Sequence, residues 1–283
     1  MQDLRHRLRP LLHSGIPFKV SGAIEEIVAS KDPDLIDWAL GPVRVKKLGE
    51  NAHHRWRYGD ACEPGHPSLD VASLLRLAGA GTSKRCAELR VALKSLCVEV
   101  DEYSDHYLDV ASLRGATGLQ TLRLYGCELD SRWEWRAESK PREVQNLDVL
   151  STLTGLEHLI IANTSGVDVA AIAALPRLRR LELSVTDVVD LAPLASSPLE
   201  TLYVAVAPLA HVTKLPPTLR RLHLEDLPAL ASVEGLAKLP ALEELYVGGV
   251  RLTELPALAN QDTRVRFEPT RTPRTDFDPA PTL

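Results

Sequence analysis

The sequence predicts an α/β solenoid, in which stacked units each contribute one strand to a parallel sheet on the concave side of an arc. The first indication is a recurring segment of the form Leu-x-x-Leu-x-Leu, with isoleucine or valine at some third positions. The second is the short, nearly regular spacing of these segments, which begin at residues 119, 156, 178, 199, 219 and 242. Weaker copies begin at Leu93 and Asp262, so we expect about eight units.

The units are short, so we expect 3-10 or irregular turns on their outer side rather than full helices. One interval is longer than the others and contains extra polar residues at 131–146, which we expect to protrude as a loop. This loop carries Trp133 and Trp135, whose rings either bind a partner or fold back onto the solenoid. We place the solenoid at residues 93–268 and a disordered, proline-rich tail at 269–283.

Residues 1–92 are predicted to form a mainly helical N-terminal cap region, because the terminal unit of a solenoid needs its core covered. Ser21, Asp32 and Ser83 are the expected helix caps, with a helix over 23–28 after the first of them. Residues 49–67 are polar and are expected to form a loop. A separate interaction module is the alternative to a cap.

The segment 178–194, with Leu-x-x-Leu-x-Leu followed by Asp-Leu-Ala-Pro-Leu, resembles the short bacterial leucine-rich repeats of the SDS22-like or internalin type. The resemblance covers residues 93–268 and implies a curved sheet whose concave face binds other proteins. The sequence departs from the family at its asparagine slot. Threonine and cysteine are expected to satisfy the backbone there in part, whereas aliphatic residues predict less regular C-terminal units. The slot holds Cys127, Thr164, Thr186, Ala207, Leu227 and Val250.

Because strand side chains alternate, the residues between the leucines are expected to point outward from the concave face. Tyrosine and arginine are frequent there, and both are typical of protein-binding hot spots. The charges are mixed in sign, which favours a protein over a phosphate backbone. The alternative is that strand positions simply favour such residues. The candidate partner-binding residues on this face are Arg123, Tyr125, His158, Arg180, Glu182, Tyr203, Arg221, His223, Glu225, Glu244, Tyr246, Arg264 and Arg266.

Composition argues against several other functions. A formal net charge of −5 gives no support for a nucleic-acid partner. No apolar stretch approaches the ~20 residues that cross a bilayer, so no membrane contact is expected. The short polar segment after the basic N-terminus is unlike a secretion signal, and the cysteines lack paired spacing, which suits reduced thiols, so we expect a cytoplasmic location.

The best metal candidates lie in one polar loop but lack the paired spacing of zinc knuckles and remain weak: His53, His54, Cys62 and His66. No cofactor, catalytic residue or small-molecule substrate is expected. The sequence predicts a non-enzymatic protein-protein interaction module that acts as an adaptor, sensor or inhibitor subunit. One alternative is a structural subunit that uses the helical cap and the 131–146 loop. Another is an enzyme or zinc protein centred on the N-terminal region.

Overall fold

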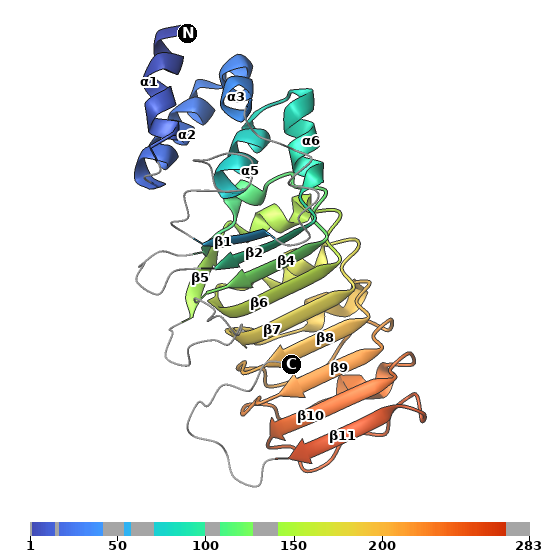
Figure 1. Ribbon diagram of the computed structural model, residues 1–283. Helices are drawn as coiled ribbons and strands as arrows, with labels where there is room; N and C mark the ends of the chain where they lie inside the picture. The colour runs from blue at the N-terminus through green and yellow to red at the C-terminus, as the bar shows by residue number, and fades with distance from the viewer. Residues whose placement is uncertain are drawn as a thin grey trace.

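The computed structural model describes residues 2–14, 17–41, 54–57, 71–99, 108–126 and 141–269. Parallel strands stack in one curved sheet with helices at its N-terminal end (Figure 1). Along the stack, the strands are β1 (His54–Arg57), β2 (Ser95–Glu99), β4 (Thr121–Tyr125), β6 (His158–Ser165), β7 (Arg180–Thr186), β8 (Thr201–Ala205), β9 (Arg221–Glu225), β10 (Glu244–Val250) and β11 (Arg264–Pro269).

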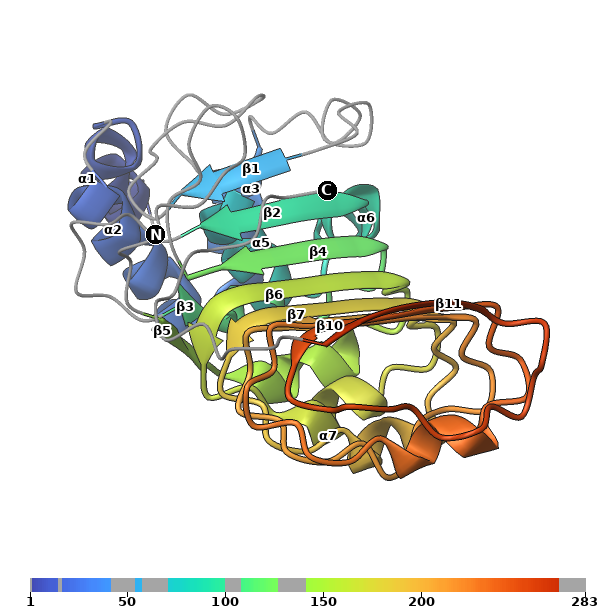
Figure 2. The ribbon, with the colours of Figure 1, turned by 90° about the horizontal axis from the view of Figure 1, so that it is seen from below.

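The opposite side of each coil is formed by turns and short helices, as the length of the units predicts (Figure 2). These helices are η1 (Ala111–Leu113), η2 (Leu147–Thr152), α7 (Val169–Ala173), η3 (Ala192–Ser196) and η4 (Glu234–Lys238). Only α7 is α-helical among them, and Asp168 caps it by accepting hydrogen bonds from the amides of Ala170 and Ala171. Units of this length therefore close with a short helix or, between β8 and β9 and between β10 and β11, without a helix.

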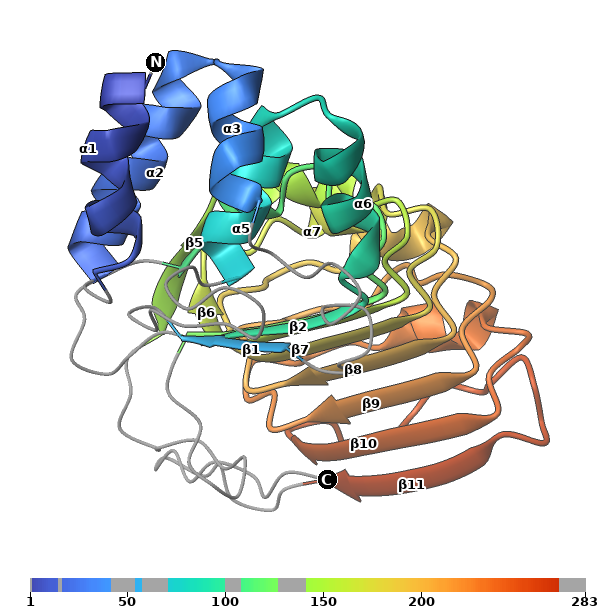
Figure 3. The same cartoon turned by 45° about the horizontal axis from the view of Figure 1, so that its top comes forward.

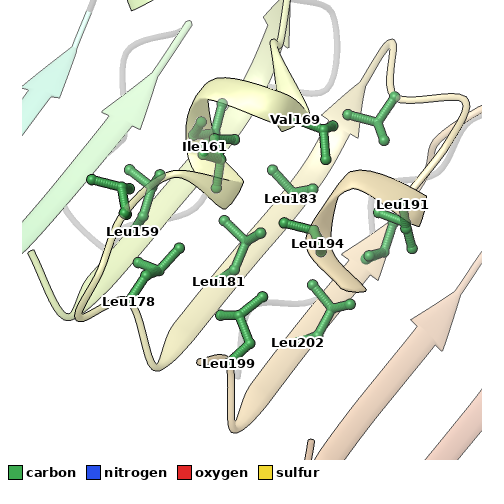
Figure 4. Packing of buried hydrophobic residues seen from close by; sticks show 14 of the residues in the cluster. Leu159, Ile161, Val169, Leu178, Leu181, Leu183, Leu191, Leu194, Leu199 and Leu202 are labelled. Carbon is green, nitrogen blue, oxygen red and sulfur yellow. The ribbon is translucent and has the colours of Figure 1, made fainter. Parts of the chain in front are cut away.

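Between the two sides lies a continuous core in which the leucines of each unit pack against those of the next (Figure 4). Leu159, Leu181 and Leu202 occupy the same slot in three successive strands, and all are 0% exposed. Full burial of one such side chain contributes about 1.5–3 kcal/mol. Because every unit repeats the contribution, stability grows by stacking rather than from one central core.

The N-terminal helices have a second core of their own. They are α1 (Gln2–Leu12), α2 (Pro17–Ser30), α3 (Pro33–Leu40), α5 (Val71–Ala80) and α6 (Lys84–Ala92), and they gather at one end of the stack (Figure 3). Helix α5 joins the two cores, since Leu75 is buried in the repeat core whereas Leu77 is buried among the helices. The helical body therefore covers the first units of the solenoid.

Two of the predicted caps are confirmed. The Asp32 side chain accepts a hydrogen bond from the Asp34 amide at 2.9 Å, and the Ser83 hydroxyl accepts one from the Cys86 amide at 3.2 Å. The prediction for Ser21 is wrong, because α2 begins at Pro17 and Ser21 lies inside it. A proline at the first helical position has a preset φ and no amide that needs a partner.

The strands differ from the prediction at two places. Nine strands lie on the main path instead of eight, because β1 forms within residues 49–67, which were predicted to be a loop. In addition, residues 142–145 of the predicted insertion form a strand, β5 (Arg142–Gln145), which pairs with β6 and with the short β3 (Leu108–Asp109). Residues 131–140, with Trp133 and Trp135, lie outside the described residues.

Five successive units, those of β6 to β10, share a left-handed backbone turn. In each of them, the residue that follows the last column of outward residues has a positive φ: 53° at Asn163, 50° at Val185, 51° at Val206, 48° at Asp226 and 64° at Gly249. Asparagine, aspartate and glycine tolerate this conformation, but a β-branched side chain is strained by it. The fold therefore imposes the same turn on all five of these units, including the two whose residue does not favour it.

The residues at the asparagine slot differ in one respect from what the sequence predicts. The Thr164 and Thr186 hydroxyls are buried without a hydrogen-bond partner, so threonine does not satisfy the backbone as predicted. The aliphatic residues of the later units instead pack into the core, where Leu227 and Val250 are 0% exposed. The pairing of β8, β9 and β10 keeps its register as far as Gly248, whereas the pairing of β10 with β11 shifts register between Gly248 and Val250. The β10–β11 pair thus shows the irregularity that was predicted for the C-terminal units, at the slot that holds Val250.

Candidate protein-binding face

Strand register places the outward residues in straight columns across the sheet. The middle column, which carries one residue from each of eight strands, runs Cys97, Arg123, Ile160, Glu182, Tyr203, His223, Tyr246 and Arg266. The column before it runs from Ser95 to Arg264, and the column after it from Glu99 to Glu268. The spacing of the leucines predicted all three columns.

Three rings stack in the middle column of strands β8, β9 and β10. The ring centroids of Tyr203 and His223 are 4.6 Å apart with planes tilted by 39°, and those of His223 and Tyr246 are 4.2 Å apart and stacked, with planes 28° from parallel. Offset ring pairs at such distances stabilise one another beyond the area that they bury. All three side chains are half-buried, so each keeps one surface open toward the concave side. We call these residues the ring ladder.

Carboxylates fix the polar ends of the ring ladder. Glu225 Oε2 accepts a hydrogen bond from the Tyr203 hydroxyl at 3.1 Å and lies 3.0 Å from His223 Nε2. The Tyr246 hydroxyl donates to Glu268 Oε2 at 3.2 Å. The Arg266 guanidinium lies 5.4 Å from the Tyr246 ring centroid, within reach of a cation–π contact. The rings are therefore held in place by hydrogen bonds within the chain.

The electrostatics of this cluster follow from burial and hydrogen bonding. The hydrogen bond from His223 holds the pKa of Glu225 below its ordinary value, against the opposing effect of burial. Burial, followed by the negative charge of Glu225, raises the pKa of the Tyr203 hydroxyl well above its ordinary value. Tyr203 is thus a neutral hydrogen-bond donor and Glu225 an ionised acceptor at neutral pH. Neither is poised for proton transfer.

Charged residues flank the ring ladder and pair with one another along the sheet. Arg180 pairs with Glu182 on the same strand. Glu244 pairs with Arg264 and, at 3.2 Å, with Arg221. These arginines are largely exposed, so each pair contributes at most about 1 kcal/mol to stability. Breaking one such pair should therefore change the stability of the sheet only slightly.

The N-terminal half of the face has a different character. Arg123 and Tyr125 are half-buried and His158 is exposed. Cys97 and Ala162 are buried, so they contribute little surface to this half. Among the described residues, the stacked rings lie only in the C-terminal half of the sheet.

We did not predict from the sequence that glutamates bond to the arginine or histidine two residues earlier on the same strand. The pairs Arg180–Glu182, His223–Glu225 and Arg266–Glu268 each join one outward residue to the next on the same strand. The sequence pattern Arg/His-x-Glu could have predicted these contacts, because residues two apart on a strand share one face of the sheet. Glu268 was not among the predicted site residues.

The remaining candidates contribute no described site. His53, Cys62 and His66 lie outside the described residues, and only the backbone of His54 is described, in β1. Within the described ranges, no group of three or more His, Cys, Asp or Glu side chains is arranged to hold a metal ion. No helix in those ranges is long and apolar enough to span a bilayer.

The repeat period, the in-register parallel strands and the shared leucine core together define a leucine-rich-repeat solenoid. No family model and no curated protein matches the sequence.

Several solved structures have a similar fold. Internalin C2 of Listeria monocytogenes str. 4b F2365 has 18% identity over 79% of this chain and 90% of its own, with a TM-score of 0.48. A Leptospira interrogans LRR protein has 17% identity over 66% of this chain and 51% of its own, with a TM-score of 0.45. TLR13 in its complex with ssRNA13 has 18% identity over 81% of this chain and 34% of its own, with a TM-score of 0.46. At these identities the likeness concerns the fold alone.

Proposed function

We propose that this chain is a non-enzymatic protein-binding module that holds a protein partner on the C-terminal half of its concave sheet. The observation that carries the proposal is the ring ladder of Tyr203, His223 and Tyr246, which is stacked, half-buried and anchored by Glu225 and Glu268. Prearranged aromatic side chains lose little conformational freedom on binding, and they dominate the energetics of protein interfaces.

The flanking charges support a protein rather than a nucleic acid. Arg180, Arg221 and Arg264 alternate with Glu182 and Glu244 around the ring ladder. A phosphate backbone would meet repulsion from the two glutamates, whereas a protein surface of mixed charge can pair with both signs. The proposed partner therefore places an apolar or aromatic segment on the rings and charged residues of both signs around them.

We propose that the module acts in the cytoplasm as an adaptor, sensor or inhibitor subunit. The helical body supports an adaptor in particular, because its helices have a core of their own and lie at the end of the stack away from the ring ladder (Figure 1). A cytoplasmic location is supported by the cysteine pattern of the sequence, which lacks the paired spacing of disulfide caps.

Affinity capture with variant baits tests the proposal. Tyr203→Ala, Tyr246→Ala, Arg180→Glu and Arg221→Glu should each lower recovery of the same captured protein, the tyrosine variants by about tenfold or more, as expected for hot-spot residues. Arg177→Glu is the matched control, since Arg177 is exposed but lies outside the strands. Circular dichroism should show that every variant is folded. Equal recovery with all four concave-face variants would refute the assignment of this face.

A further inference from the structure

Strand β11 ends the described sheet, and within the described chain only one of its edges is paired. That edge pairs with β10, and the Arg264 amide donates to the Glu243 carbonyl at 2.8 Å. Because peptide groups alternate in direction along a strand, those of Arg264, Arg266 and Glu268 face β10. The peptide groups of Val265 and Phe267 therefore face outward, where no strand of the described chain pairs with them.

The core is also open at this end. Val265 occupies a leucine slot, yet it is 48% exposed, whereas Leu245 in the same slot of β10 is 2% exposed. At the opposite end, Leu75 of α5 is buried in the repeat core. The helices lie at that end, and β11 lies at the far end of the stack (Figures 1 and 3). The described residues thus cover one end of the solenoid and leave the other uncovered.

The exposed edge is complementary to itself. When the strand Arg264-Val265-Arg266-Phe267-Glu268 is paired antiparallel with a second copy about a two-fold axis at Arg266, each Arg264 lies opposite the Glu268 of the other copy. Each Val265 lies opposite Phe267, on the side that faces the core. These two residues carry the outward peptide groups, so both pairs form complete sets of backbone hydrogen bonds.

Pairing two copies of β11 in either neighbouring register gives less favourable contacts. A two-fold axis at Phe267 sets Val265 opposite Pro269, which has no amide hydrogen to donate. An axis at Val265 sets Arg264 opposite Arg266 twice, which places like charges directly across the pair. In the register centred on Arg266 one such contact remains, between the two copies of Arg266. Glu268 moderates it, because its carboxylate accepts a hydrogen bond from Arg266 Nε at 2.7 Å.

We propose that β11 pairs antiparallel with β11 of a second copy, so that two solenoids join end to end in a symmetric dimer. The two-fold axis is then perpendicular to the sheet, and both concave faces point to the same side. The dimer carries two ring ladders on one continuous surface. This inference does not require the proposed function, because backbone pairing along the edge of β11 carries it, although Arg264 and Glu268 also lie beside the ring ladder.

A charge-swap pair tests the register. Arg264→Glu and Glu268→Arg each replace two attractive cross-copy contacts by repulsive ones, so each variant alone should dissociate about tenfold more readily than the wild type. When the two variants are mixed, both of these contacts in the heterodimer again join a glutamate to an arginine, and attraction is restored. Native mass spectrometry, with one variant carrying a mass tag, should therefore show the heterodimer as the main dimeric species.

A second variant tests the apolar contact. Val265→Lys should give a monomer by sedimentation velocity, whereas Val189→Lys should leave the dimer unchanged, because Val189 is 64% exposed and lies between β7 and η3, away from β11. A wild-type chain that stays monomeric throughout a dilution series would overturn the proposal. So would a mixture of the charge variants that forms no heterodimer. A dimer that forms only after residues 270–283 are removed would show that this segment occupies the edge instead.

Discussion

The hydrogen bond from Tyr203 to Glu225 provides a test of whether the ring ladder is prearranged. Tyr203→Phe removes only the hydroxyl that donates to Glu225 Oε2 at 3.1 Å and leaves the ring in contact with His223. A hydrogen bond to a charged group contributes about 1.5–3 kcal/mol when buried. Both side chains here are half-buried, so we expect about 1 kcal/mol after solvent screening.

A double-mutant cycle isolates this contribution. The free energy of unfolding is measured by urea titration, followed by circular dichroism, for the wild type, Tyr203→Phe, Glu225→Ala and the double variant. We expect a coupling energy of about 1 kcal/mol at neutral pH. The m-values must agree among the four proteins, because repeat arrays can unfold in parts and a change in slope would invalidate the comparison.

The same cycle with Tyr246 serves as the control. The Tyr246 hydroxyl donates to Glu268 and not to Glu225, so Tyr246→Phe combined with Glu225→Ala should be additive within about 0.3–0.5 kcal/mol. A coupling below about 0.3 kcal/mol for Tyr203 would refute a hydrogen bond that fixes the ladder. Equal coupling for both tyrosines would show that the energy comes from general electrostatics instead.

Three further predictions concern pH, a buried hydroxyl and a strained turn. Because the folded pKa of Glu225 lies below its ordinary value of 4.5, its contribution to stability is present above that pH and is lost as the pH falls through the folded pKa. The stability of Glu225→Gln should therefore depend less steeply on pH in this acidic range, by urea titration at each pH. Thr186→Val should raise the free energy of unfolding by about 1 kcal/mol, because it removes a buried hydroxyl that has no partner; a loss of stability would show that the hydroxyl is bonded. Val206→Asn should raise it by about 1 kcal/mol, since Val206 has a φ of 51° that asparagine tolerates better; an unchanged thermal midpoint would contradict strain at this turn.

The fold could be predicted because one physical constraint recurs. Each unit must bury the same leucine slots, so their spacing determines the strands, the register and the columns of outward residues. Strand β1 escaped prediction because its core slots, by register with Leu96 and Val98, hold His54 and Trp56. Neither residue follows the leucine pattern, and only pairing with β2 reveals the unit.

The candidate site could be predicted in position but not in detail. The columns place Tyr203, His223 and Tyr246 in a row, yet the hydrogen bond from Tyr203 to Glu225 crosses from one column to the next. Such diagonal contacts depend on side-chain rotamers and on the twist of the sheet, which the repeat spacing does not encode. The same holds for Thr186, whose hydroxyl could be assigned a partner only once its surroundings were known.

Site-specific photo-crosslinking tests most directly whether a protein partner sits on the concave face beside the ring ladder. Thr201 lies in the column next to Tyr203, on the same face, and Arg177 is exposed outside the strands. A benzophenone amino acid at position 201 should form a covalent adduct with one cellular protein, whereas the same group at position 177 should not. Adducts from position 177 and none from position 201 would contradict the proposed binding face.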